Sequence, residues 1–262
     1  MDKWEVFKQN IDKLINIDLN YYKEKQMKRR ITSLMIRNGY NDFDEYFLGL
    51  KSDKALLDQF INYLTINVSE FYRNPSQWEV LGKEILPDLV SKYKRPIKVW
   101  SSACSTGEEP YSLVMLLTKF YNLNQIEVLA SDIDEGAIEK AKIGLYGEKA
   151  LANLPGQFKQ EYFEKVGNSY KIKDIIKNRV EFKKLDLLKD PFPKDMDLIT
   201  CRNVMIYFTD EAKELLYKKF HDSLSQEGVF FVGSTEQIIL PERYNFKSIK
   251  TFFYKKLNSY PK

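Results

Sequence analysis

The chain has 262 residues, of which 44% are hydrophobic and 14% aromatic, which suits one large domain or a small domain joined to a medium one. Two cysteines and one histidine are too few for a disulfide framework, a zinc site or a mechanism that needs two histidines. No run approaches the ~18 apolar residues of a membrane-spanning helix, and the first residues lack the apolar stretch of a signal peptide. We therefore expect a reduced, cytoplasmic protein that binds no metal and does not insert into a membrane.

Residues 1–75 are predicted to form a small all-helical domain. Apolar residues recur at helical spacing in four stretches, for example Met27, Ile31 and Leu34 in the second. Asn38-Gly39 is a typical helix end, and no strand pattern appears before Ile97. Residues 76–95 are expected to form a linker helix.

The net charge of +4 is concentrated in the second predicted helix. Between Tyr21 and Arg37 there are six basic residues and one acidic residue. A solvated helix face explains this pattern, and so does docking to an acidic partner. Nucleic acid has less support, because no aromatic residues interleave with the basic ones. The candidate docking residues are Lys25, Lys28, Arg29, Arg30 and Arg37.

A polar segment follows the helices. In residues 65–75, Asn67, Ser69 and Arg73 alternate with bulky apolar residues, and Pro75 disfavours helical geometry at the residue before it. The segment can be a plain connection between domains. Alternatively, its polar side chains can face a ligand where two domains meet, which is a common place for pockets.

An α/β domain is predicted over residues 96–262. It opens with a buried strand at residues 97–100, a tight turn of small residues, and a helix that begins near Pro110. This order is typical of a doubly wound fold, in which ligands bind beyond the strand ends. The turn contains no Gly-x-Gly-x-x-Gly, so a dinucleotide pyrophosphate is poorly supported. Glu108 and Glu109 either complement the helix dipole or accept hydrogen bonds from a cationic ligand.

Two aspartates after the second strand of this domain have different expected roles. Asp132 directly follows the strand, where nucleoside-binding α/β folds hold ribose hydroxyls. Asp134 is better explained as the N-cap of the next helix.

The second half of the α/β domain contains an expected insertion. Tyr162–Val166 and Tyr170–Ile172 flank a glycine turn and predict a β hairpin near residues 160–175. Further strands are expected before a helix that contains His221, which is predicted to lie on the helix surface. The C-terminal stretches are expected to form an antiparallel pair.

Four motifs follow one another at domain-like spacing. They are Asn67-Val-Ser-Glu-Phe-Tyr-Arg73, Ala103-Cys-Ser-Thr-Gly-Glu-Glu-Pro-Tyr111, Ala130-Ser-Asp-Ile-Asp134 and Cys201-Arg-Asn-Val-Met-Ile-Tyr-Phe208. In combination they resemble the bacterial chemotaxis receptor methyltransferases of the CheR family, and the resemblance covers nearly the whole chain. It implies a seven-stranded, Rossmann-like, S-adenosylmethionine-dependent methyltransferase domain with a small inserted β hairpin, preceded by an all-helical domain.

The resemblance also implies an activity and a set of site residues. The activity is transfer of a methyl group from S-adenosylmethionine to glutamate side chains on the cytoplasmic helices of chemoreceptors, with S-adenosylhomocysteine as product. Glu109 is expected to hold the cofactor's amino group and Asp132 its ribose. By motif position, the cofactor-binding residues are Asn67, Ser69, Arg73, Glu109, Asp132, Asp186, Leu187, Arg202 and Asn203, and the catalytic residues are Arg73 and Tyr207.

Several alternatives remain open at this point. Arg73 can instead form an interface salt bridge, and Tyr207 can pack in a core. The chain can be a methyltransferase of the same fold that acts on RNA or a small molecule, or an inactive cofactor-binding module. A glutamate acceptor needs no general base, because its reference pKa of ~4.3 leaves it ionised at neutral pH. The short turn at Gly167 leaves little room for tethering a receptor peptide through the β insertion.

Overall fold

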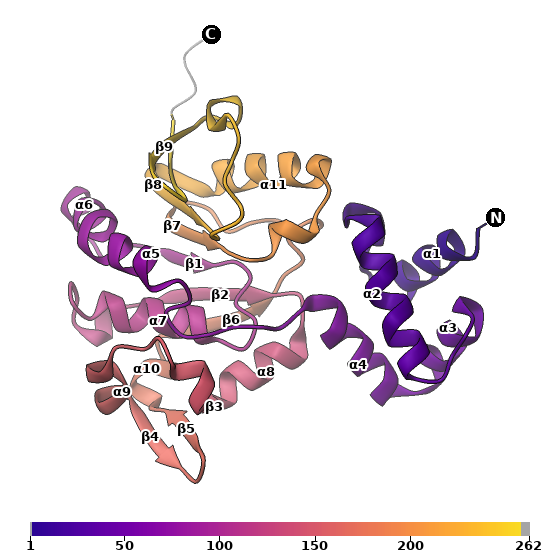
Figure 1. Cartoon of the computed structure of the whole chain (residues 1–262). Coiled ribbons are helices and arrows are strands. Elements are labelled where there is room, and N and C mark those ends of the chain that lie inside the picture. Colours follow the sequence, from indigo (N-terminus) through magenta and orange to yellow (C-terminus); the bar gives the residue numbers. More distant parts are fainter. Residues whose placement is uncertain (1, 258–262) are drawn as a thin grey trace. The chain divides into compact units, whose positions relative to one another are not determined.

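The computed structural model describes residues 2–257, which form two compact units (Figure 1). The smaller unit contains the residues up to Asn67 together with Val204–Leu215, and the larger unit contains Val68–Asn203 and the residues from Leu216 onward. The sequence pattern predicts this boundary near residue 75 instead. Phe71 and Tyr72 account for the difference, because both side chains are buried in the apolar core of the larger unit.

Four helices make up most of the smaller unit. They are α1 (Lys3–Ile15), α2 (Glu24–Arg37), α3 (Phe43–Ser52) and α4 (Lys54–Thr65), with the short 3-10 turn η1 (Leu19–Tyr21) after α1. Asp2, Asp42 and Asp53 each cap a helix by accepting a hydrogen bond from a backbone N–H of its first turn. Phe7 of α1 stacks on Tyr46 of α3 and meets Phe60 of α4 edge to face. The predicted all-helical domain is confirmed.

A segment from much later in the chain completes this unit. It begins with the 3-10 turn η5 (Met205–Tyr207), whose last backbone carbonyl accepts a 2.9 Å hydrogen bond from the backbone N–H of Lys23. Phe208 then pairs with Tyr22 in an isolated antiparallel bridge, and the two rings meet edge to face.

The larger unit is built on a seven-stranded sheet in the order β6-β2-β1-β7-β8-β10-β9. The first five of these strands are parallel, and β10 runs antiparallel to both of its neighbours. The predicted doubly wound sheet and its antiparallel C-terminal pair are therefore confirmed. The strands are β1 (Val99–Ser101), β2 (Val128–Asp132), β6 (Val180–Lys184), β7 (Met196–Cys201), β8 (Leu224–Val232), β9 (Phe246–Lys250) and β10 (Phe253–Lys256).

Helices connect these strands and cover the sheet. The most deeply placed is α7 (Glu108–Leu117), in which every residue is buried. Gly107 caps α7 with φ +94, and a Cβ there would lie 2.8 Å from the Cβ of Ala141, so only glycine fits this turn. The other segments are α5 (Pro75–Val80), the π-helical turn η2 (Leu81–Ile85), α6 (Leu86–Lys92), η3 (Leu123–Gln125), α8 (Glu135–Ile143), η4 (Glu148–Leu151), α9 (Gly156–Tyr162), α10 (Asp174–Lys177), α11 (Asp210–Ser223) and η6 (Pro241–Tyr244). The first part of α11, up to Leu215, belongs to the smaller unit.

A second, antiparallel sheet interrupts the strand–helix alternation. It consists of β3 (Leu145–Gly147), β5 (Ser169–Ile172) and β4 (Phe163–Val166), in that order. In Figure 1 it lies at the opposite end of the larger unit from β9. The predicted hairpin is present as β4 and β5, and β3 adds a third strand that is too short to show a pattern of its own. The buried Tyr146 fixes β3, because its hydroxyl donates a 2.8 Å hydrogen bond to the carbonyl of Thr106.

His221 does not lie on the surface as its sequence context suggests. Only 8% of the residue is exposed, its ring meets Phe246 of β9 edge to face, and its Nε2 lies 3.1 Å from the carbonyl of Leu257. The terminal strands therefore cover this side of α11. Within residues 2–257, no helix is long and apolar enough to cross a membrane, and no three His, Cys, Asp or Glu side chains are grouped as metal ligands would be.

Candidate functional site

The parallel strands bring polar side chains to one edge of the large sheet. Strands β1, β2 and β7 end at Ser101, Asp132 and Cys201, and Ser101 is in register with Ala130 on one side and Thr200 on the other. The carboxyl ends of parallel strands lie at the same edge, which is where ligands bind in folds of this class. The candidate site is built from the segments that leave these strand ends.

Asp132 has a buried carboxylate held by backbone N–H groups. Its Oδ2 accepts a 2.7 Å hydrogen bond from the N–H of Ser105, and its Oδ1 accepts one of 3.0 Å from the N–H of Asp134. Burial raises the pKa of Asp132 to about 6. The side chain of Asp134 instead caps α8 through the N–H of Ala137, as the sequence predicts. Asp132 is thus the aspartate of this pair that is available for a ligand.

Glu108 and Glu109 have different surroundings although they are adjacent in the first turn of α7. The Glu108 carboxylate accepts hydrogen bonds from the hydroxyls of Thr106, at 2.7 Å, and Ser69, and burial raises its pKa. Glu108 therefore connects the predicted site residue Ser69 to the turn after β1.

Glu109 points toward the strand ends instead. Its Oε1 accepts hydrogen bonds from Ser101, at 2.8 Å, and Thr200, at 2.5 Å, and its Oε2 lies 3.2 Å from Nη1 of Arg202. A carboxylate has about four acceptor positions, and these contacts use three of them. Oε2 can therefore accept a further hydrogen bond from a ligand.

Arg202 follows β7 and has one of the most buried charges in the larger unit. Only 2% of its side chain is exposed, and burial lowers the pKa of its guanidinium. The group lies near the rings of both Trp78 and Phe231, with centroids 5.7 Å and 4.6 Å away. Its Nη2 donates to oxygens of the segment that begins at Arg73.

Arg73 has a fixed backbone and a half-buried side chain. Its carbonyl accepts hydrogen bonds from Nη2 of Arg202, at 2.7 Å, and from Nε1 of Trp78, at 3.0 Å. Its own Nη1 donates to the carbonyl of Val68 at 2.9 Å. Arg73 forms no salt bridge with a carboxylate of the described residues, so its guanidinium has further N–H donors for a ligand.

The remaining predicted residues of the larger unit lie on loops after β6 and β7. Asp186 Oδ1 accepts a 2.8 Å hydrogen bond from the N–H of Leu188, and Leu187 is buried. Burial raises the pKa of Asp186. Asn203 has φ +61, and its N–H donates to Glu236 Oε2 at 2.6 Å.

Four residues of the site were not predicted from the sequence. Ser101 and Thr200 could have been found, because each is a polar residue in an apolar strand that ends at the ligand-binding edge of the sheet. Gln77 and Glu236 carry no sequence signal, because each is defined only by the distant group that it contacts.

Asn67 and Tyr207 belong to the smaller unit. Asn67 Nδ2 donates a 3.1 Å hydrogen bond to Thr65 Oγ1. Tyr207 is half-buried in η5, where its carbonyl accepts from Lys23. The larger unit therefore contains eight of the nine predicted cofactor residues, whereas Asn67 and the predicted catalytic residue Tyr207 lie in the smaller unit.

The basic residues of α2 divide into two groups. Arg30 and Arg37 stack on Tyr63 of α4, with centroid distances of 4.5 Å and 5.0 Å, and Arg30 Nη2 also donates to the carbonyl of Tyr63. These two arginines therefore pack within the helical unit. Lys25 and Arg29 are exposed, and Lys28 lies 5.6 Å from the ring centroid of Trp4.

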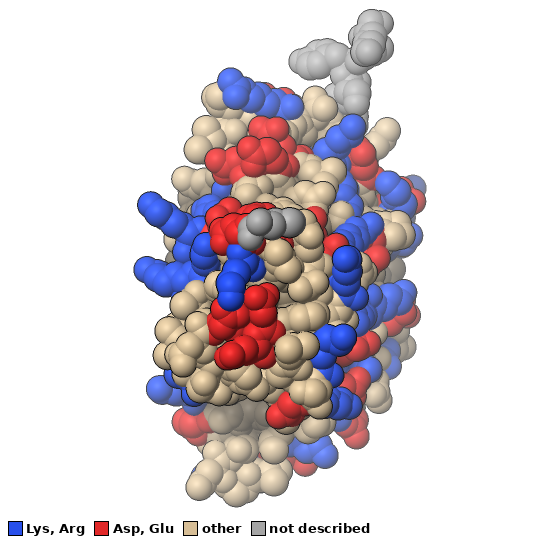
Figure 2. All heavy atoms as spheres, turned by 90° about the vertical axis from the view of Figure 1, so that its right-hand side faces the viewer, with Lys and Arg blue, Asp and Glu red and all other residues tan. Residues whose placement is uncertain are grey.

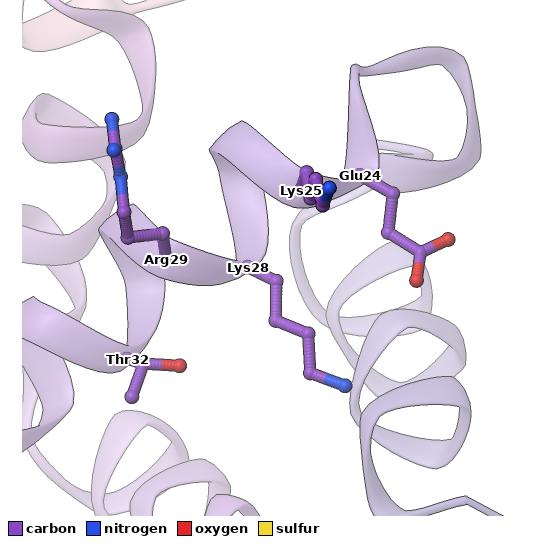
Figure 3. Close-up of a pocket in the computed structure, with 5 residues that line it drawn as sticks. All are labelled: Glu24, Lys25, Lys28, Arg29 and Thr32. Atoms are coloured by element: carbon purple, nitrogen blue, oxygen red, sulfur yellow. The ribbon is translucent and has the colours of Figure 1, made fainter.

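A surface groove of about 480 Å³ lies along α2, lined by Glu24, Lys25, Lys28, Arg29 and Thr32. In Figure 3, Glu24 and Lys28 extend to one side of the helix and Arg29 to another. Figure 2 shows acidic side chains in the middle of the face it presents and basic side chains along both sides, where acidic side chains are interspersed with them on the right. A partner that binds along α2 therefore meets three positive charges and one negative charge.

Comparisons with known proteins extend over both units. Residues 67–253 match the family model "CheR methyltransferase, SAM binding domain", and residues 2–65 match "CheR methyltransferase, all-alpha domain". A chemotaxis protein methyltransferase of Listeria innocua is 42% identical over 240 residues, which cover 92% of this chain and 92% of the relative. Proteins with the same name from Borreliella burgdorferi and Escherichia coli are each 34% identical, covering 85% and 83% of this chain and 83% and 77% of the relatives.

Proposed function

This chain belongs to the CheR methyltransferase family, and we propose that it methylates glutamate side chains on the cytoplasmic helices of chemoreceptors, using S-adenosylmethionine. The observation that carries the proposal is the pair of buried carboxylates, Glu109 and Asp132, at the carboxyl edge of the parallel sheet. The proposed products are glutamyl methyl esters and S-adenosylhomocysteine, and the proposed substrate places the reaction in the cytoplasm.

The residues at this edge fit S-adenosylmethionine. The cofactor has a positively charged sulfonium and ammonium, which favour an acidic, poorly solvated site. Glu109 Oε2 has an unused acceptor position for the ammonium, and the Asp132 carboxylate can accept hydrogen bonds from ribose hydroxyls. Asp186 and Leu187, on the loop after β6, are assigned to the adenosine side by motif position.

The proposed chemistry requires positioning rather than proton transfer. When bound, the cofactor supplies a methyl group on a sulfonium, which the ionised acceptor carboxylate attacks in line to give the ester and a neutral thioether. No general base is needed, because a glutamate with a pKa of ~4.3 is already an anion at neutral pH. Correct placement of two reactants can lower the barrier by ~7–11 kcal/mol.

Arg73 is proposed to hold the acceptor carboxylate. A guanidinium can donate two parallel hydrogen bonds to a carboxylate and so orient it. Motif position also assigns Asn67 and Ser69, with Arg73, to the methionine end of the cofactor, and Tyr207 to the methyl group or the acceptor.

The exposed basic residues of α2 are proposed to dock the receptor. A methylated receptor helix presents rows of glutamates, so a basic helix surface would attract it over a distance that shrinks as salt is added. Lys25, Lys28 and Arg29 line the groove on α2 and are the stronger candidates. Arg30 and Arg37 are weaker ones, because Tyr63 already occupies their guanidinium faces.

Methyl transfer to a purified receptor fragment tests the proposal. The chain is incubated with S-adenosylmethionine labelled in the methyl group and with the cytoplasmic fragment of a chemoreceptor. Label on receptor glutamates that alkali releases is the expected result, since carboxyl methyl esters are base-labile. Label on RNA or a small molecule instead would contradict the proposed acceptor, and failure to bind S-adenosylhomocysteine would contradict the whole assignment.

A further inference from the structure

The guanidinium of Arg202 joins three separate segments of the larger unit. Nη1 contacts Glu109 Oε2 of α7 at 3.2 Å, and Nη2 donates to the carbonyl of Arg73 at 2.7 Å. The same Nη2 lies 3.0 Å from Gln77 Oε1 and 3.3 Å from Asn74 Oδ1. One side chain therefore contacts both the proposed ammonium-binding carboxylate and the segment that carries the proposed acceptor-binding arginine.

The stability of the fold alone does not explain why a buried arginine occupies position 202. Removing a charge from water is expensive, and a well-packed apolar side chain in its place is often as stable as a buried ion pair. Arg202 has a single carboxylate in salt-bridge contact, and its Nε is buried without a hydrogen-bond partner among the described residues. A role beyond packing explains why a guanidinium occupies this position.

The segment held by Arg202 has an unfavourable backbone. Tyr72 and Asn74 have φ values of +53 and +62, which non-glycine residues rarely adopt. Such residues persist when the surrounding structure over-determines them, and they cluster at functional sites. Here the carbonyl between them, that of Arg73, accepts two hydrogen bonds, from Arg202 and from Trp78.

We propose that Arg202 and Gln77 form a clamp that holds residues 72–74 against Glu109, so that Arg202 is a positioning residue for Arg73. This inference rests on the proposed function for the role of Arg73. Gln77 Oε1 and the Arg73 carbonyl both accept hydrogen bonds from Nη2 of Arg202. Gln77 therefore keeps the guanidinium directed toward residues 72–74. Loss of Gln77 leaves the charge pair with Glu109 in place but loosens the segment.

Gln77→Ala is the variant that separates the clamp from the cofactor site. We expect kcat for receptor methylation to fall about tenfold, because a small displacement of a positioning group is costly in an oriented reaction. The dissociation constant for S-adenosylhomocysteine, measured by calorimetry, is expected to change less than about twofold. Amides of residues 70–74 should exchange with deuterated solvent faster in the cofactor-free variant than in the parent protein.

Two further variants complete the experiment. Gln77→Glu keeps an acceptor oxygen beside the guanidinium, so it should restore both the slow amide exchange and most of kcat. Ser76→Ala is the matched control on the neighbouring, exposed position of α5 and should change neither. Thermal unfolding of each variant checks that the fold is retained.

The amide-exchange and calorimetric measurements need no methyl acceptor. They therefore test the proposed clamp even if receptor methylation is not observed. Unchanged amide exchange in Gln77→Ala would overturn the proposal. So would a loss of S-adenosylhomocysteine affinity as large as the loss of kcat, because that result would place the clamp in the cofactor site itself.

Discussion

The backbone N–H of Ser105 donates a 2.7 Å hydrogen bond to Asp132 Oδ2 and so joins the turn after β1 to the end of β2. Ser105 has φ +47, an uncommon conformation for a serine, and this directs its N–H at the carboxylate. The contact holds a buried negative charge in place while leaving it room to accept hydrogen bonds from a ligand. Four predictions test the proposed roles of Asp132, Glu109, Arg73 and the basic residues of α2.

Asp132→Asn is expected to weaken cofactor binding and to stabilise the fold at neutral pH. Loss of a charged acceptor should reduce affinity for S-adenosylhomocysteine by about 10- to 100-fold, as calorimetry would measure. The parent carboxyl has its pKa raised from 3.8 to about 6, so its ionisation opposes folding above that pH. Asparagine removes this cost of ionisation but loses one backbone hydrogen bond. The free energy of unfolding should therefore increase by about 1 kcal/mol, which raises Tm by ~2–4 °C.

The same pKa shift gives this prediction a pH dependence with a definite sign. The folded state keeps the Asp132 proton up to about pH 6, whereas the unfolded chain loses it near 3.8. The stabilising contribution of this group is therefore complete below pH 3.8 and is lost as pH rises through about 6. The stability difference between Asp132→Asn and the parent should grow over that interval, and a difference that is constant with pH would contradict the assignment.

Glu109→Gln is expected to weaken both cofactor binding and the fold. The substitution removes the carboxylate that forms a salt bridge with the buried Arg202, and breaking a buried pair in this way should lower the free energy of unfolding by about 2–4 kcal/mol. Urea unfolding and calorimetry with S-adenosylhomocysteine measure the two effects. Thr200→Val is the matched control, because it removes one hydrogen bond to Glu109 but keeps the charge pair, and it should lower stability by only about 1 kcal/mol. Equal stability of Glu109→Gln and the parent would show that the pair contributes nothing.

Arg73→Ala is expected to abolish methyl transfer while sparing most cofactor affinity. Without the guanidinium the acceptor carboxylate loses its orientation, so kcat should fall by about 100-fold or more. Arg73→Lys keeps the charge without the paired donors and should give an intermediate rate. Turnover of Arg73→Ala at the parent rate would exclude the proposed role, and a large loss of S-adenosylhomocysteine binding would assign Arg73 to the cofactor alone.

Charge reversal on α2 should distinguish docking residues from packing residues. Replacing both Lys25 and Arg29 with glutamate should raise the apparent KM for receptor about tenfold at low salt. The Tm and the KM for the cofactor should change little. The increase in the KM for receptor should become smaller as salt is added. Arg30→Glu should instead lower stability by about 1–2 kcal/mol, because Arg30 stacks on Tyr63 and donates to its carbonyl. Equal effects of the double reversal on the KM values for receptor and cofactor would rule out docking through this face.

The sequence by itself determined the features that depend on neighbouring residues. Helical spacing defined the all-helical domain, the alternation of apolar strands and helices defined the doubly wound sheet, and the four motifs placed the candidate site at the strand ends. The assignment of Asp134 as the N-cap of α8 also follows locally, since a helix N-cap is recognised from the few residues after it.

Only the tertiary structure decided which distant groups meet. Arg202 and Gln77 are 125 residues apart, and their side chains are in contact at 3.0 Å. The residues next to each of them in the sequence do not indicate this contact. The burial of His221 under the terminal strands, the stacking of Arg30 on Tyr63 and the pairing of β3 with β5 are of the same kind. Short-range preferences specify helices, strands and caps, whereas the partner of a buried charge is chosen by the packing of whole elements.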